Sequence, residues 1–574
     1  MKKTVLTLLM AAMVVASAQA QCPANPVNLV SVGTGTSAKT GFEITTNTTW
    51  TRSNIYLLNG IVYVNSGVTL TIEPGTIIKG SFANQGALVI RRGGKINAAG
   101  TATQPIVFTS EKPAGQRQPG DWGGVIICGN APTNKAGDPQ IEGGTLANYG
   151  GNDPNDNSGV LQYVRIEYPG IPFLPGNEIN GLTLGGVGAG TTIDHIQVTA
   201  SGDDSFEWFG GSVNAKYLIA LAGTDDDFDT DNGFSGRVQF GVAVRDQSRG
   251  DFANNGVSNG FESDNDSDNS ARTPQTSAVF SNMTILLPTS PAPASPFNNS
   301  AGALIRQNSA QSIFNSVFAG RRSGLEIAGG GAGTTQANAT SGALAFQNNV
   351  LAGYSPRAGR IGGATSATPA FNINAFVGGN GNDTTRTVAG VGLNGDNFFF
   401  NGNCSGNAQC VPSFALPATS MLNAGAAFTS SKLTGAGNGG PNSTFEVVNY
   451  RGAFGATNWA TGWTNFNPQN TCYNTPGSVL AAKSAADEKV QALSVAPNPT
   501  EGAAVLSFDL PRAAVVTVRV LDVTGREVAL VSGATKLLAG NQTIQLPASL
   551  KAGLYLASVT TEGSVQTVRF VVAK

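Results

Sequence analysis

The chain has 574 residues, of which 74 are Gly and 12% are charged, the latter about half the usual share. This composition excludes coiled coils and amphipathic helix bundles and is typical of an all-β chain with many turns. The net charge is −2 and no basic cluster is present, so we expect no nucleic-acid partner. The single histidine, His195, excludes multi-His metal centres and argues against Ser-His-Asp catalysis. It lies in an alternating strand, which predicts that it faces outward at the surface.

Residues 1–20 have the pattern of a secretory signal peptide. Lys2 and Lys3 precede an apolar core, and small residues at Ala18 and Ala20 predict cleavage near Ala20. No later apolar run reaches the roughly 18 residues of a membrane helix, so we expect no membrane-spanning segment in the mature chain. These features predict an exported protein that passes through the periplasm.

Export to an oxidising compartment allows the five cysteines to form disulfides. Cys404 and Cys410 are close together in a loop rich in Gly and Asn, and we expect them to pair. Cys22, Cys128 and Cys472 then leave at least one thiol unpaired, and the sequence does not decide which.

In chain order, short β-type runs ended by Gly or Pro-Gly recur from residue 42 onward. A strand-and-turn unit repeated every 20 to 35 residues or so is the signature of a solenoid. We therefore predict an all-β chain: a right-handed parallel β-helix followed by a small antiparallel immunoglobulin-like β-sandwich. The expected parts after the signal peptide are an N-terminal cap with first coils and an excursion loop (21–160), regular coils (161–354), C-terminal coils and a cap (355–472), a linker (473–492) and a final domain (493–574).

The predicted cap contains aromatic residues, including Trp459 and Trp463. The end of a solenoid exposes unpaired strand edges that must be covered. We therefore expect these aromatics to pack in a cap over the last coil and not to form a sugar platform.

An acidic motif recurs in the middle of the chain. Aligning the coils on Phe206, Phe228 and Phe261 places Glu207, Asp229 and Glu262 in one row, and the same pattern predicts that Arg306 and Glu326 continue it. Coils stack about 4.8 Å apart, so like charges in such a row repel unless water, an arginine or a hard cation compensates them. Calcium is the expected cofactor, because it prefers oxygen ligands. The candidate metal ligands are Asp203, Asp204, Asp226, Asp227, Asp229, Asp231, Glu262 and Asp264.

Three functions fit this row of charges. The favoured one is a non-catalytic adhesin or glycan-binding protein whose acidic turns are held by Ca²⁺. The second is a polysaccharide lyase or glycoside hydrolase of the β-helix type, with catalytic candidates Glu207, Asp229, Glu262 and Arg306, in which Arg306 would be the base of a lyase. In the third, the acids are solvated turn residues that prevent edge-to-edge aggregation.

The last 80 residues or so carry four motifs in order. They are Pro497-Asn498-Pro499, a turn with Asp522, Gly525 and Arg526, a Gly553-Leu554-Tyr555 segment, and an apolar final strand that ends in a basic residue. On these residues the domain resembles the type A C-terminal sorting domain of type IX secretion. The resemblance implies transport by the type IX secretion machinery to the outer cell surface or the medium. Segments 121–124 and 206–211 make the body similar to the β-helical cargo proteins that carry this domain.

Overall fold

The computed structural model divides the chain into two compact units, Met1–Leu480 and Ala481–Lys574. It describes residues 22–174, 177–246, 248–250, 257–288, 300–320, 322–328, 334–354, 359–362, 371–393, 412–477, 490–510, 514–538, 540–561 and 565–573. The predicted signal peptide and the predicted pair Cys404 and Cys410 lie outside these residues.

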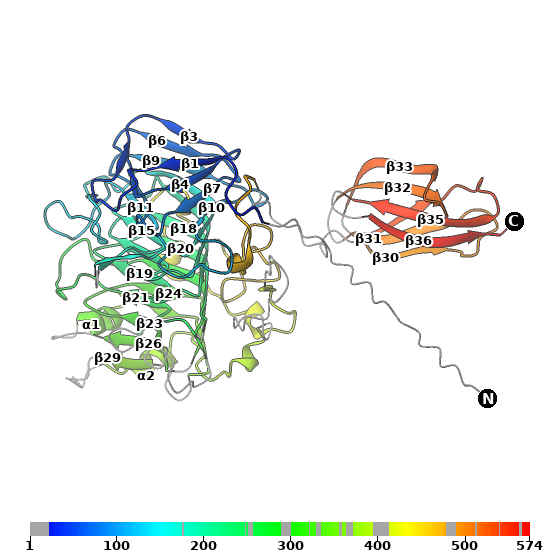
Figure 1. Ribbon diagram of the computed structural model, residues 1–574. Helices are drawn as coiled ribbons and strands as arrows, with labels where there is room; N and C mark the ends of the chain where they lie inside the picture. Colours follow the sequence, from blue (N-terminus) through cyan, green and yellow to red (C-terminus); the bar gives the residue numbers. More distant parts are fainter. Residues whose placement is uncertain are drawn as a thin grey trace, which may run out of the picture. The chain divides into compact units, whose positions relative to one another are not determined.

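The first unit is a parallel β-helix in which each coil adds a strand to each of three faces (Figure 1). One face is an eleven-stranded parallel sheet, which we call the eleven-stranded face. Its strands, in order, are β2 (Phe42–Ile44), β5 (Ile61–Val64), β8 (Ala87–Ile90), β11 (Val125–Cys128), β15 (Leu182–Gly185), β17 (Phe206–Phe209), β19 (Phe228–Asp231), β21 (Phe261–Ser263), β23 (Ala301–Ile305), β26 (Ser323–Ala328) and β29 (Gly359–Gly362).

A sixteen-stranded parallel sheet forms the other two faces, because residues with positive φ bend its long strands. Tyr163, His195 and Tyr217 occupy this bend on three successive coils, with φ of 48°, 53° and 59°. The strands are β1 (Leu29–Val32), β3 (Thr48–Trp50), β4 (Ile55–Leu58), β6 (Thr69–Ile72), β7 (Ile77–Gly80), β9 (Lys95–Ala99), β10 (Ile106–Ser110), β12 (Gly159–Glu167), β16 (Thr192–Thr199), β18 (Asn214–Leu221), β20 (Arg237–Val244), β22 (Val279–Leu286), β24 (Ser312–Phe314), β25 (Val317–Ala319), β27 (Phe346–Gln347) and β28 (Val350–Ala352).

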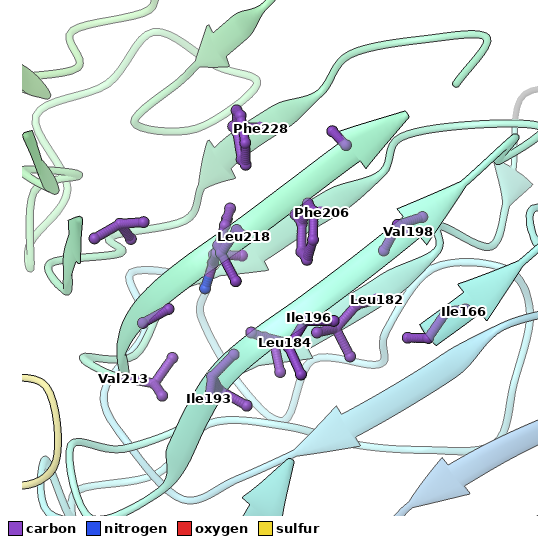
Figure 2. Packing of buried hydrophobic residues seen from close by; sticks show 14 of the residues in the cluster. Ile166, Leu182, Leu184, Ile193, Ile196, Val198, Phe206, Val213, Leu218 and Phe228 are labelled. Atoms are coloured by element: carbon purple, nitrogen blue, oxygen red, sulfur yellow. The ribbon is translucent and has the colours of Figure 1, made fainter. Parts of the chain in front are cut away.

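The inside of the tube is a continuous apolar core. Alternate residues of each strand point inward, as the period of two requires, and equivalent residues of successive coils stack. Figure 2 shows Phe206 and Phe228 in this core, and their ring centroids are 5.5 Å apart. Leu182 and Phe261 occupy the same position on the coils before and after them. The prediction of a parallel β-helix is therefore confirmed.

An excursion between β11 and β12, residues 129–158, covers the outer side of the eleven-stranded face over its first coils. Its residues Ile141, Ala147 and Tyr149 pack in one buried cluster with Tyr63 and Val89. The outward positions of these coils are apolar for that reason.

We expected residues 355–472 to close the end of the solenoid, but residues 412–477, which we call the strap, lie along its side. Phe414, Phe454 and Trp463 of the strap pack on outward apolar residues of the sixteen-stranded sheet, such as Leu221 and Val244. The predicted cap was wrong for this segment, because outward apolar residues extend along the face and must also be covered.

The strap continues to the N-terminal coils and is fixed there. A disulfide joins Cys22 and Cys472, and Tyr473 donates a hydrogen bond of 2.7 Å to Glu167. Cys128 is buried and unpaired, and burial raises its pKa to about 12.

His195 faces away from the core, as the alternation predicts, but the strap covers it. Its ring stacks between Tyr163 and Tyr217, each at 4.3 Å, and Trp463 lies edge-on at 5.5 Å. The side chain is 14% exposed, so His195 is not an open surface residue as we had predicted.

The last coil is closed by a short helix, α2 (Ile373–Gly378), whose Ile373 and Val377 join the main core. The other short elements are the hairpin β13 (Pro172–Leu174) and β14 (Asn177–Glu178), the helices α1 (Thr334–Ser341) and α4 (Ser431–Thr434), and the 3-10 helices Ala389–Val391, Met421–Asn423 and Pro468–Asn470. Within the described parts of the chain, no helix is long and apolar enough to cross a membrane.

The second unit is an antiparallel β-sandwich with its own buried core. One sheet has the order β30 (Gln491–Ala496), β31 (Val505–Leu510) and β34 (Gly540–Gln545). The other has the order β33 (Glu527–Leu537), β32 (Ala514–Asp522), β35 (Gly553–Thr560) and β36 (Val565–Val572). The predicted sandwich is confirmed.

Candidate functional site

One outward row runs down the eleven-stranded face and changes character along its length. Strand pairing places Tyr63, Val89 and Ile126 in this row under the excursion. The row then continues through Thr183, Glu207, Asp229, Glu262, Leu304 and Glu326. The predicted alignment of the three acidic residues is therefore correct, and their row begins where the apolar, covered part ends.

The prediction that Arg306 belongs to this row is wrong. Glu262 pairs with Leu304, so Arg306 lies two positions further along the chain. The inward residue before Leu304 is Ala303, which lacks the aromatic signal used for the alignment. Arg306 forms ion pairs with Glu262 and, at 2.9 Å, with Asp264.

A second polar column lies two residues before Leu182 and before each of the inward phenylalanines that follow it in the stack. It consists of Asn180, Asp204, Asp226 and Asn259, all buried. Each of the last three accepts a hydrogen bond from a backbone N–H of the following coil: Asp204 from Asp226 at 2.7 Å, Asp226 from Asn259, and Asn259 from Ala301 at 2.9 Å. Asparagine performs this capping at 259, so capping alone does not require carboxylates at 204 and 226.

Three carboxylates from the two columns converge. One oxygen from each of Asp204, Glu207 and Asp229 lies within 4.8 Å of the other two. Asp204 and Glu207 are only 7% and 6% exposed, and Oδ1 of Asp229 is buried without a hydrogen-bond partner among the described residues. We call these three residues the carboxylate trio. Asp204 also belongs to a second group with Asp203 and Asp225.

The electrostatics of the trio are unfavourable in the absence of a cation. Burial and neighbouring carboxylates raise the pKa of Asp204, Glu207 and Asp229 well above the ordinary range. Desolvation penalises the charged form of each group, and each charge disfavours the next. A divalent cation at this position would offset both effects by attracting all three carboxylates.

Two residues at the trio, Asn180 and Glu142, were not among the candidates predicted from the sequence. Nδ2 of Asn180 donates to Glu142 at 2.7 Å and also to Glu207, so the excursion that carries Glu142 is joined to the site. Asn180 was detectable, because it precedes Leu182 by the same two residues that separate Asp204 from Phe206. Glu142 was not detectable, because no repeat positions an excursion.

The other predicted metal ligands have different partners. Asp227 forms a buried ion pair of 2.9 Å with Arg245, and both side chains are fully covered. Burial and Asp264 raise the pKa of Asp231 to about 7. Glu262 and Asp264 share Arg306. Asp227, Glu262 and Asp264 are thus paired with arginines, which distinguishes them from the trio.

The trio fits a hard cation. Calcium binds oxygen ligands at 2.3–2.6 Å, so two ligands of one ion lie at most about 5 Å apart, and the separations in the trio meet that limit. The donors are all carboxylates, with no His or Cys, which favours a hard cation over zinc or copper.

The contacts of the motif residues in the second unit explain why these residues occur at their observed spacing. Asp522 and Gly525 form a tight turn in which Oδ1 of Asp522 accepts from Thr524 N at 2.9 Å and Oδ2 accepts from Arg526 at 3.0 Å. Gly525 has φ of +85°, a conformation that favours glycine. Asn498 joins the start of the domain to the last strand, because its Oδ1 accepts from Val571 N at 2.9 Å.

In the same domain, Pro497 and Pro499 flank Asn498, and Gly553 opens β35. Tyr555 packs against Phe570 with ring centroids 5.7 Å apart. A stacked parallel β-helix followed by a separate antiparallel sandwich defines a two-domain protein of the β-helix class.

Comparison with protein families agrees with this class. Residues 42–391 match the pectate-lyase like beta helix domain, and residues 494–573 match the secretion system C-terminal sorting domain. The first match covers more than half of the chain, so the chain belongs to the pectate-lyase like β-helix family. The sorting domain implies a secreted or cell-surface protein handled by the type IX secretion machinery. A search of curated proteins gave no match.

Proposed function

We infer that this exported protein is a non-catalytic, glycan-binding adhesin whose β-helix is stabilised by Ca²⁺ at the carboxylate trio. The observation that carries the calcium proposal is the convergence of Asp204, Glu207 and Asp229 within 4.8 Å, with a buried and unpartnered oxygen on Asp229. Calcium sites of extracellular modules have a Kd of about 10⁻⁴ to 10⁻³ M, and we expect the trio to fall in this range.

The ion would act as a clamp between coils. Asp204 and Glu207 belong to one coil and Asp229 to the next, so one cation would bind successive coils together. Asn180 and Glu142 would fix the excursion to the same point. We expect the bound ion to stabilise the coils of the eleven-stranded face that follow the excursion.

Two observations favour binding over catalysis. Glu262 and Asp264 raise the pKa of Arg306 although burial opposes the shift, so this arginine is a poor proton acceptor for a lyase. Asp204 and Glu207 are almost fully buried, so a polymer does not reach them as it would have to for hydrolysis.

A glycan array with the full chain, in Ca²⁺ and in EDTA, tests the proposal together with a turnover assay on the same glycans. We expect binding to a subset of glycans and no cleavage products. Cleavage that is lost in Arg306→Gln or Asp229→Asn would establish an enzyme instead, and an array with no bound glycan would contradict the adhesin.

A further inference from the structure

The outer surface of the first coils contains a shallow depression of about 480 Å³, far from the acidic row in sequence. It lies at the turns that lead from β5 to β6 and from β8 to β9, beside the excursion. The residues that line it are Asn65, Ser66, Arg91, Arg92, Leu146 and Asn148. Its volume is within the range of small-ligand sites.

The first arginine of the depression is held in place from below. The Arg91 guanidinium lies over the ring of Tyr63, 4.1 Å from the centroid. Its Nη1 donates to Glu43 at 2.7 Å and to Asn65 at 2.8 Å. Tyr63 is itself fixed, because its hydroxyl donates to Lys39 O at 2.7 Å. A ligand would therefore meet an arginine that is already oriented.

The second arginine is held by the excursion. Nη1 of Arg92 donates to Asp138 at 2.8 Å and to Gly150 O at 2.9 Å. Asn148 donates to the same Asp138 through its Nδ2. The depression is thus built from three segments, the turns that follow β5 and β8 and the excursion, and hydrogen bonds join them.

Both arginines keep N–H donors that no described residue uses. Each guanidinium has five N–H groups, and the bonds it makes to described residues use Nη1. Nε of Arg91 is buried, so Nη2 is the group that Arg91 offers to a ligand. The amide oxygen of Asn65 already accepts from Arg91, and that of Asn148 accepts from Gln140 at 3.5 Å. The side chains of Arg91 and Arg92 are 26% and 34% exposed, so both stay accessible.

The complementary ligand is rich in acceptors and has one apolar face. Paired N–H donors of arginine match the two oxygens of a carboxylate or sulfate. Leu146 is 43% exposed at the rim and offers an apolar surface to the C–H face of a sugar ring. Glu43 and Asp138 balance much of the positive charge, so the site selects by geometry more than by net charge.

We propose that this depression is the glycan subsite of the protein and that it binds an acidic pyranose unit, bearing a carboxylate or a sulfate, of a polysaccharide. The proposal rests on the proposed glycan-binding function and names its location and its sugar class. Arg91 and Arg92 bind the anionic group, and Leu146 packs against the ring.

Calorimetric titration of the full chain with three probes tests the subsite: trigalacturonate, a sulfated trisaccharide and neutral maltotriose. We expect binding of at least one acidic probe, no binding of maltotriose, and at least a tenfold or so weaker affinity in Arg92→Gln and Leu146→Ser. Arg386→Gln is the matched control, because Arg386 is also an exposed arginine in an ion pair, at 2.7 Å from Asp383. It should leave the affinity unchanged.

Unchanged affinity in both site variants, or maltotriose bound as tightly as the acidic probes, would overturn the subsite. Retained melting temperatures in the variants show that a loss of binding is local. If the array detects glycans but binding is insensitive to both substitutions, the adhesin stands and the subsite fails. An array with no bound glycan refutes the adhesin itself.

Discussion

Removal of Ca²⁺ from the carboxylate trio should lower the stability of the β-helix by a measurable amount. The three oxygens lie within 4.8 Å of one another. With an effective dielectric constant of about 20, two unit charges at that separation repel by about 3.5 kcal/mol. A divalent cation among them replaces this repulsion by attraction, and its removal restores it.

Mass action sets the size of the effect. A site with a Kd of about 10⁻⁴ M, typical of extracellular modules, gains about 2.7 kcal/mol at roughly 10 mM Ca²⁺. Unfolding entropy is about 2.1 cal/mol/K per residue, or about 1 kcal/mol/K for the roughly 450 residues of the β-helix unit. We therefore expect Ca²⁺ to raise the Tm by about 3 °C relative to EDTA, as measured by differential scanning calorimetry.

Asp229→Asn separates a ligand from a merely structural carboxylate. The substitution keeps the shape and removes one repelling charge, so in EDTA the variant should be at least as stable as the wild type, whereas the Tm gain with Ca²⁺ should disappear. Glu326→Gln is the control, because Glu326 lies in the same row but outside the trio. Equal Tm values of the wild type in Ca²⁺ and EDTA, with no heat of binding, would refute the reasoning.

Three further results are expected. Buried carboxyl groups with a raised pKa, such as Asp231 with a pKa of about 7, stabilise the fold at low pH, and this stabilisation is lost as the pH rises through the raised pKa. The Tm in EDTA should therefore increase when the pH is lowered from 8 to 5, and the increase should be smaller in Ca²⁺. A Tm that does not change with pH in EDTA would contradict the burial of these groups. The disulfide Cys22–Cys472 joins residues 450 positions apart, so its reduction should lower the free energy of unfolding by several kcal/mol, with about 6 kcal/mol from chain entropy alone. Reduction should also expose the end of the strap to proteases, and an unchanged rate of proteolysis would contradict this anchoring role. Arg245→Met should destabilise by about 3–5 kcal/mol in chemical denaturation, since it leaves Asp227 buried and unpaired, whereas the double variant with Asp227→Leu should recover much of the loss.

The acidic repeat shows how much of the coil register can be predicted from a single sequence. The phenylalanine before each acid identified the register across three coils, because a large inward side chain recurs there. The register failed at Arg306, where Ala303 takes the inward position and gives no such signal. The trio itself combines Glu207 and Asp229 of one column with Asp204 of another, and their approach depends on how the turn folds back on the strand.

The positions of the strap and the excursion could not be predicted from sequence periodicity. Both are irregular, and their positions depend on contacts between residues far apart in the chain, such as the disulfide between Cys22 and Cys472. The cover over His195 and the contribution of Glu142 to the site follow from these contacts.

By itself, the sequence determined the parallel β-helix, the terminal sandwich, the export domain and the alignment of three acidic coils, because each is written in a local period or a short motif. The tertiary structure alone decided which carboxylates converge, which are neutralised by arginine, and which outward faces are covered. Those outcomes depend on distances between coils, turns and the strap, and burial and charge compensation act over these distances without leaving a repeat in the sequence.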